Sequence, residues 1–131
     1  MAAVFASYPP ALRKKLAALR TLIFGVAAKT EGVGALDETL RWNEPAYLTR
    51  SKSGSMIRID RHGDGYAMYF LCQTDLVPTF RRLYRDAFAF EGNRALVFGM
   101  EDKLPVAELR HCIALALTYN LRKSGLRKAQ V

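Results

Sequence analysis

Residues 56–72 of the chain have the sequence MIRIDRHGDGYAMYFLC. Ile57 and Ile59 alternate with more polar residues, which is the pattern of a strand with one exposed face. The turn-forming residues His62-Gly63-Asp64-Gly65 come next. Residues 66–72 are apolar without interruption, which predicts a central strand covered on both faces. A strand, a tight turn and a second strand are therefore expected in the middle of a sheet.

Two shorter segments predict further strands on either side of this stretch. Residues 39–42 and 47–49 flank Asn43-Glu44-Pro45. A turn or sheet edge is expected there, because proline cannot donate a hydrogen bond to a central ladder. Closer to the C-terminus, residues 88–90 and 94–98 flank Glu91-Gly92-Asn93, which predicts a second hairpin.

Three helices are predicted from apolar spacing and from proline positions. The first begins near Pro9-Pro10 and ends at residues 31–34, with an apolar stripe of Leu12, Leu16, Leu19, Ile23 and Val26. The second follows Thr74-Asp75, with Leu76, Phe80, Leu83 and Ala87 facing inward. The third begins near Asp102, with a buried side of Val106, Leu109, Ile113, Leu117 and Leu121. The order is helix, four strands, helix, two strands, helix, which predicts an α+β fold with helices packed on a mainly antiparallel sheet.

Composition favours a globular protein with a substantial core. The chain has 131 residues, of which 50% are hydrophobic and 24% charged, and it carries a net charge of +8. A signal peptide is not expected, because the first residues lack a charged segment. No apolar run approaches the roughly 20 residues that span a bilayer, so no membrane association is expected. Cys72 and Cys112 stand in apolar surroundings and are expected to be buried and reduced, which favours the cytoplasm.

The chain resembles the YdhG-like domain-of-unknown-function family. The resemblance rests on Tyr8-Pro9-Pro10, on residues 38–47 (ETLRWNEPAY), on the apolar strand at 66–72, on FEGNR at residues 90–94 and on the Leu-rich final helix. It implies an α+β fold and one domain over residues 1–131, with a core at about 8–123 and a loose C-terminal tail. One family member is described as a frataxin-like iron chaperone, so the resemblance also implies iron handling as an option.

Iron would require convergent carboxylates, since hard ferric ions prefer oxygen ligands. Asp37, Glu38 and Glu44 are the nearest candidates, although alternation along a strand turns Asp37 away from the other two. The net charge of +8 would also repel cations from most of the surface.

The sequence predicts no catalytic residue, metal site or cofactor. Residues 60–65 (DRHGDG) resemble the start of a calcium loop, but the twelfth position of that loop is Leu71 instead of glutamate. Gly32 and Gly34 follow a helix and lack the third glycine of a dinucleotide-binding loop.

Aromatic and charged residues near the first predicted hairpin are the candidate ligand site. A concave site combines apolar walls with a few polar groups. The residues expected to converge on a ligand are Trp42, Glu44, Tyr47, Arg58 and Tyr69. The alternative is that Trp42 and Tyr47 fill the space between sheet and helix.

Acidic residues are absent from both ends of the chain. Residues 1–30 and 109–131 contain no Asp or Glu. If the two terminal helices pack side by side, their outer faces form a basic surface that nucleic acid or another anionic partner could bind. The candidate anion-binding residues are Arg13, Arg20, Arg122 and Lys123. A solvated face that keeps the protein soluble is the alternative.

These observations favour a non-catalytic binding module for a small molecule or a protein partner. Binding of nucleic acid through the basic terminal helices and iron chaperoning are the alternatives.

Overall fold

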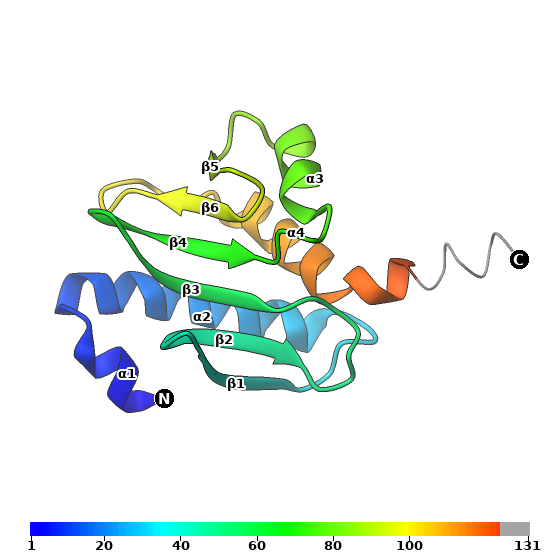
Figure 1. Ribbon diagram of the computed structural model, residues 1–131, viewed down its shortest axis with the longest axis horizontal. Helices are drawn as coiled ribbons and strands as arrows, with labels where there is room; N and C mark the ends of the chain where they lie inside the picture. Colours follow the sequence, from blue (N-terminus) through cyan, green and yellow to red (C-terminus); the bar gives the residue numbers. More distant parts are fainter. Residues whose placement is uncertain (124–131) are drawn as a thin grey trace, which may run out of the picture.

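The computed structural model describes residues 1–123, which form one six-stranded sheet with helices packed on it (Figure 1). The elements are α1 (Ala2–Ser7), α2 (Pro10–Lys29), β1 (Leu36–Arg41), β2 (Glu44–Thr49), β3 (Ile57–His62), β4 (Gly65–Phe70), α3 (Leu76–Leu83), β5 (Ala89–Glu91), β6 (Ala95–Phe98) and α4 (Val106–Leu117). The predicted order is confirmed, and a short helix, α1, precedes it. The predicted loose tail falls on residues 124–131, outside the described part of the chain.

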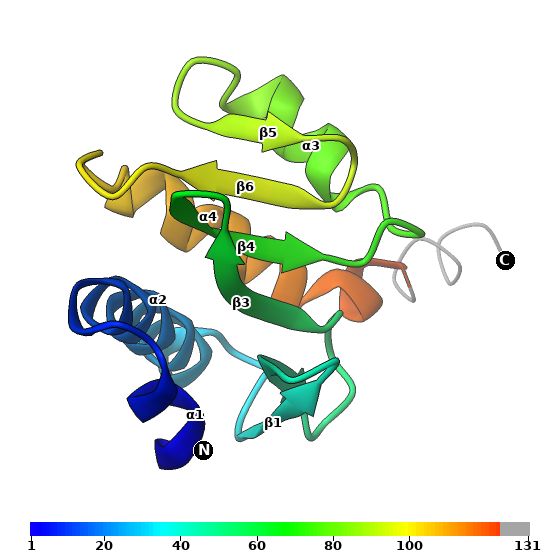
Figure 2. The same cartoon turned by 60° about the vertical axis from the view of Figure 1, so that its left-hand side comes forward.

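The sheet has the strand order β1-β2-β3-β4-β6-β5, and every neighbouring pair is antiparallel. The α+β architecture predicted from consecutive strands is thereby confirmed. Helices α2 and α4 lie side by side on one face of this sheet (Figures 1 and 2). The opposite face carries no helix in residues 1–123, and we refer to it as the helix-free face.

The main core lies between the sheet and α2 and α4. All five residues of the predicted α2 stripe are buried, and they meet the apolar face of β4 formed by Tyr66, Met68 and Phe70. No helix of the described chain has the length and apolar character needed to cross a membrane.

Several side chains that were expected to be buried lie at the surface. Leu83, the last residue of α3, is 52% exposed, and Leu121, which lies four residues past the end of α4, is 45% exposed. Cys72 is exposed, since β4 ends at Phe70. Cys112 is buried in α4 as predicted, and burial raises the pKa of its thiol to about 12.

The first turn of the sheet also differs from the prediction. It consists of Trp42 and Asn43, and Pro45 lies within β2. Pro45 is tolerated there because the ladder between β2 and β3 begins only at Ala46. The absence of an N–H group at Pro45 therefore removes no hydrogen bond between these strands.

Gly25 in α2 offers a test of helix propensity. A Cβ added at Gly25 meets no atom within 4 Å, and its backbone φ is not positive. We expect Gly25→Ala to raise the free energy of unfolding by about 0.5–1 kcal/mol, because alanine loses less backbone entropy in a helix. Chemical denaturation of both proteins measures this difference, and a decrease in stability would contradict the expectation.

Candidate functional site

The turn between β1 and β2 holds an exposed tryptophan in a left-handed backbone conformation. Arg41 and Glu44 are paired across the two-residue turn, whose central residues Trp42 and Asn43 have φ angles of 53° and 63°. Positive φ at both positions is typical of a type I′ turn, which favours Asn and Gly. A bulky residue there costs about 1–2 kcal/mol. Trp42 is nevertheless 73% exposed, so burial of its ring does not offset this strain.

Arg58 connects this tryptophan to the centre of the sheet. Its guanidinium carbon lies 4.7 Å from the centroid of Trp42 and 5.1 Å from that of Tyr69, within the range of cation–π contacts. Its Nη1 donates to both carboxylate oxygens of Glu44 at 2.8 Å. The helix-free face therefore carries a connected group of Trp42, Glu44, Arg58 and Tyr69, which we call the Trp42 cluster.

Strand register places these side chains together. Arg58 is paired with Ala46 on one side and with Tyr69 on the other, so the three point to the same face of the sheet. Ala46 is small and leaves room for the guanidinium group beside Glu44. This arrangement follows from the pairing of three strands, which the local sequence does not specify.

Two residues that the sequence did not single out border the cluster. The guanidinium carbon of Arg94 lies 5.7 Å from the ring centroid of Tyr69, and Nδ1 of His62 lies 3.2 Å from the Tyr69 hydroxyl oxygen. Arg58 and His62 are four residues apart in β3, so side-chain alternation along the strand places them on the same face. The sequence could therefore have indicated His62 as a neighbour of the cluster. Arg94 reaches Tyr69 only because β6 pairs with β4.

Burial shifts the protonation of the cluster. It raises the pKa of Glu44, and the attraction of Arg58 offsets only part of this effect. It also raises the pKa of Tyr69, with the Glu44 carboxylate adding to the shift. The cluster therefore presents an aromatic surface and a paired arginine, groups suited to stacking and hydrogen bonding.

Tyr47 does not join the cluster. It pairs with Ile57, one residue out of step with Arg58, and therefore points to the opposite face of the sheet. There it is fully buried against Phe24 of α2, and its hydroxyl donates to Glu38 at 2.8 Å. Of the five residues expected to converge, Tyr47 fills the core, and the other four lie together.

The three carboxylates considered for iron are each neutralised by a different arginine. Asp37 accepts from Arg50 at 2.7 Å, Glu38 from Arg20 at 2.5 Å, and Glu44 from Arg58. Within residues 1–123, no three His, Cys, Asp or Glu side chains are grouped so that they could hold a metal ion. The expectation that Asp37 alone points away was wrong: Glu38 is paired with Tyr47 and faces the helices, whereas Asp37 and Glu44 lie on the helix-free face.

The Arg20–Glu38 pair predicts a pH-dependent stability. Burial alone would raise the pKa of Glu38, but the hydrogen bonds from Arg20 and Tyr47 outweigh burial and hold this pKa below its usual value. The folded state therefore favours the ionised carboxylate. The resulting stabilisation is complete above the unfolded-state pKa of about 4.3 and is lost as the pH falls through the lower folded-state value.

We expect Glu38→Gln to lower the free energy of unfolding by about 1–2 kcal/mol at neutral pH, because charged hydrogen bonds are lost. Urea denaturation of both proteins between pH 7 and pH 3 measures the difference. It should shrink toward pH 3, and a constant difference over this range would contradict the assignment.

Three of the four candidate anion-binding residues, Arg13, Arg20 and Arg122, form hydrogen bonds within the protein. Arg13 donates to the carbonyl oxygens of Phe5, Ala6 and Tyr8, and so closes the end of α1. Arg20 is held by Glu38. Arg122 Nη1 donates to the hydroxyl oxygen of Thr118. The guanidinium carbon of Arg122 and Nζ of Lys123 each lie 6.0 Å from the ring centroid of Tyr119.

Comparison with known proteins identifies the fold. No family model matches the chain, and no curated protein matches it. A solved structure does: YdhG from Bacillus subtilis, a protein of the DUF1801 family. The two superpose with a TM-score of 0.66 over 87% of this chain and 85% of YdhG.

The chain has the YdhG-like fold. The resemblance inferred from sequence motifs is confirmed at the level of architecture, since sequence identity with YdhG is 12%.

Proposed function

We propose that this YdhG-like chain is a non-catalytic module that binds another protein through its helix-free face, with the Trp42 cluster at the centre. The observation that carries the proposal is Trp42 itself. A tryptophan that is 73% exposed stands at a strained turn position, and the ring contact that it makes in residues 1–123 is with Arg58.

The composition of the cluster is that of a binding hot spot. Tryptophan, tyrosine and arginine dominate the few residues that supply most of the energy of protein interfaces. Arg58 is already held by Glu44 and by two aromatic rings. A partner would therefore lose little energy in ordering this side chain.

The charge of the helix-free face favours a protein over nucleic acid. Its arginines are Arg41, Arg50, Arg58 and Arg94, and its carboxylates are those of Asp37, Glu44, Asp60 and Glu91. Four carboxylates and four guanidinium groups balance on this face, although the whole chain carries +8. This face therefore offers a polyanion no net electrostatic attraction, whereas its mixed charges and aromatic rings suit a protein surface.

The test compares Trp42→Asn with the wild type. Asparagine suits the left-handed turn, so the variant should fold with at least the original stability. Proteins retained by the immobilised wild-type chain from extracts of its own cells would be purified, and their dissociation constants measured directly. We expect Trp42→Asn to weaken the direct interaction about thirtyfold or more, the effect of losing a hot-spot residue.

Leu83→Ala is the matched control. Leu83 is also an exposed apolar residue, at 52%, but it lies in α3 on the other side of the sheet. The partner should bind this variant as tightly as the wild type. If Trp42→Asn binds the partner with the affinity of the wild type, the proposal is wrong.

A second candidate function is binding of an anionic polymer on the opposite side of the molecule. It is favoured by the packing of α2 against α4, which brings Lys14, Lys29 and Arg110 onto the exposed side of neighbouring helices. Salt-dependent binding of duplex DNA, lost on reversing these three charges, would support it. Absence of binding at low salt would remove it.

A further inference from the structure

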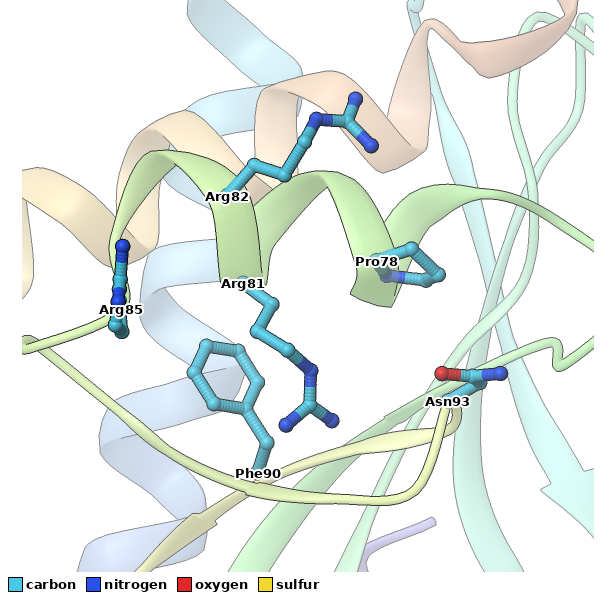
Figure 3. A pocket seen from close by; sticks show the side chains of 6 residues that line it. All are labelled: Pro78, Arg81, Arg82, Arg85, Phe90 and Asn93. Atoms are coloured by element: carbon cyan, nitrogen blue, oxygen red, sulfur yellow. The ribbon is translucent and has the colours of Figure 1, made fainter.

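A cavity of about 670 Å³ lies between α3 and the β5–β6 hairpin, away from the Trp42 cluster. Figure 3 shows the side chains around it, with Arg81 pointing from α3 toward the hairpin. The residues that line it are Pro78, Arg81, Arg82, Arg85, Phe90 and Asn93. Three of these six are arginines, and none is acidic.

Arg81 is held in place within the cavity. Its guanidinium carbon lies 4.7 Å from the centroid of Phe90, and its Nη2 donates to the carbonyl oxygen of Gly92 at 2.6 Å. A guanidinium group has five N–H donors, so most of the donors of Arg81 stay available to a ligand. The contact with Phe90 orders the side chain before any ligand arrives.

The other two arginines add positive charge that no carboxylate compensates. In the described part of the chain, none of the three arginines forms an ion pair, although five ion pairs occur elsewhere. Arg82 donates to the hydroxyl of Thr79, and Figure 3 shows its side chain leaving α3 on the side opposite Arg81 and Phe90, so Arg82 contributes charge at the rim of the cavity. Arg85 stands just past the end of α3, at one end of the cavity.

We propose that this cavity binds a compact polyanion that carries two or more phosphate groups. Clusters of arginine recognise phosphate through charge-assisted and bidentate hydrogen bonds. The volume falls in the range of small-molecule sites and exceeds the need of a single phosphate ion. Pro78 and Phe90 supply apolar walls that could accommodate the organic part of such a ligand.

This site is separate from the helix-free face. Phe90 is paired with Leu96, which is fully buried in the main core, so both side chains point to the helical side of the sheet. Glu91 points to the opposite side and contacts Arg94 there. The phosphate site could therefore be occupied while a protein is bound at the Trp42 cluster, and failure of either proposal leaves the other standing.

Isothermal titration of the full chain with inorganic tripolyphosphate tests the proposal. We expect saturable binding at low salt, at least tenfold tighter than the binding of orthophosphate. Arg85→Gln should weaken the binding of tripolyphosphate about tenfold, the equivalent of one charge-assisted hydrogen bond. This variant should fold normally, because Arg85 has no hydrogen bond or ion pair in residues 1–123.

Arg61→Gln is the matched control: it removes one exposed guanidinium group from β3, which β4 separates from the β5–β6 hairpin, and should change the affinity by less than about twofold. A parallel titration with a nucleoside triphosphate separates two sources of the ligand. Tighter binding than that of tripolyphosphate would identify a nucleotide, and equal binding would identify the phosphate chain itself. Absence of tripolyphosphate binding at low salt, or equal effects of Arg85→Gln and Arg61→Gln, would overturn the proposal.

Discussion

Replacing Gly54 with alanine is expected to lower the free energy of unfolding by about 3 kcal/mol. A Cβ added at Gly54 would lie 2.3 Å from both the carbonyl carbon and the carbonyl oxygen of Leu117. These are backbone atoms of a helix, so they cannot rotate away as a flexible side chain would. Either the loop or the end of α4 must move.

The movement would break the contacts that close the C-terminal end of α4. Ser53 Oγ donates to the carbonyl oxygen of Leu117 at 2.8 Å, and the N–H of Ser55 donates to that of Ala116 at 2.9 Å. The last carbonyl groups of a helix have no partner within the helix and need such donors. The loop before β3 therefore supplies the hydrogen bonds that α4 lacks.

Urea denaturation of Gly54→Ala measures this cost, with Gly25→Ala as the control for the same change in a helix with free space. The two variants should shift stability in opposite directions. A Gly54→Ala protein within about 1 kcal/mol of the wild type would mean that the loop does not press on α4 as described.

The second large effect is expected at Arg58. Its side chain and that of Glu44 are only 16% and 17% exposed, so replacing Arg58 with methionine leaves a mostly buried carboxylate without its partner. Breaking a fully buried pair costs about 3–5 kcal/mol. Because both groups keep some contact with water, we expect Arg58→Met to cost about 2–3 kcal/mol.

The double variant Glu44→Gln/Arg58→Met separates the charge from the packing. It should recover at least half of the lost stability, because the unpaired carboxylate is gone. Arg58→Met should also lose more stability at pH 7 than at pH 4, since protonation of Glu44 removes the isolated charge. Equal losses for the single and the double variant would show that the ion pair contributes little.

Much of this fold could be predicted from local sequence. The α2 stripe, the uninterrupted strand at residues 66–70 and the turns at His62–Gly65 and Gly92 are formed by patterns of a few residues. Helix ends were harder, as the exposure of Leu83 at the end of α3 and of Leu121 past the end of α4 shows. The position of Pro45 inside β2 depended on the register between β2 and β3, which involves residues far apart in sequence.

The candidate site depended even more on long-range register. Trp42, Glu44, Arg58 and Tyr69 were expected to converge, and strand pairing places all four on one face. Tyr47 was expected with them, but a one-residue step turned it to the other side. The bond between Glu38 and Tyr47 follows from the pairing of these two residues across β1 and β2, whereas the bond between Glu38 and Arg20 required the packing of α2 on the sheet.

Fluorescence of Trp42 gives the most direct test of the proposed function, because it is the only tryptophan in the chain. At 73% exposure, its emission should resemble that of tryptophan in water, and acrylamide should quench it readily. Addition of a saturating amount of the protein partner, prepared without tryptophan, should shift this emission to shorter wavelength and protect it from acrylamide. Unchanged emission and quenching with the partner bound would show that the interface lies elsewhere.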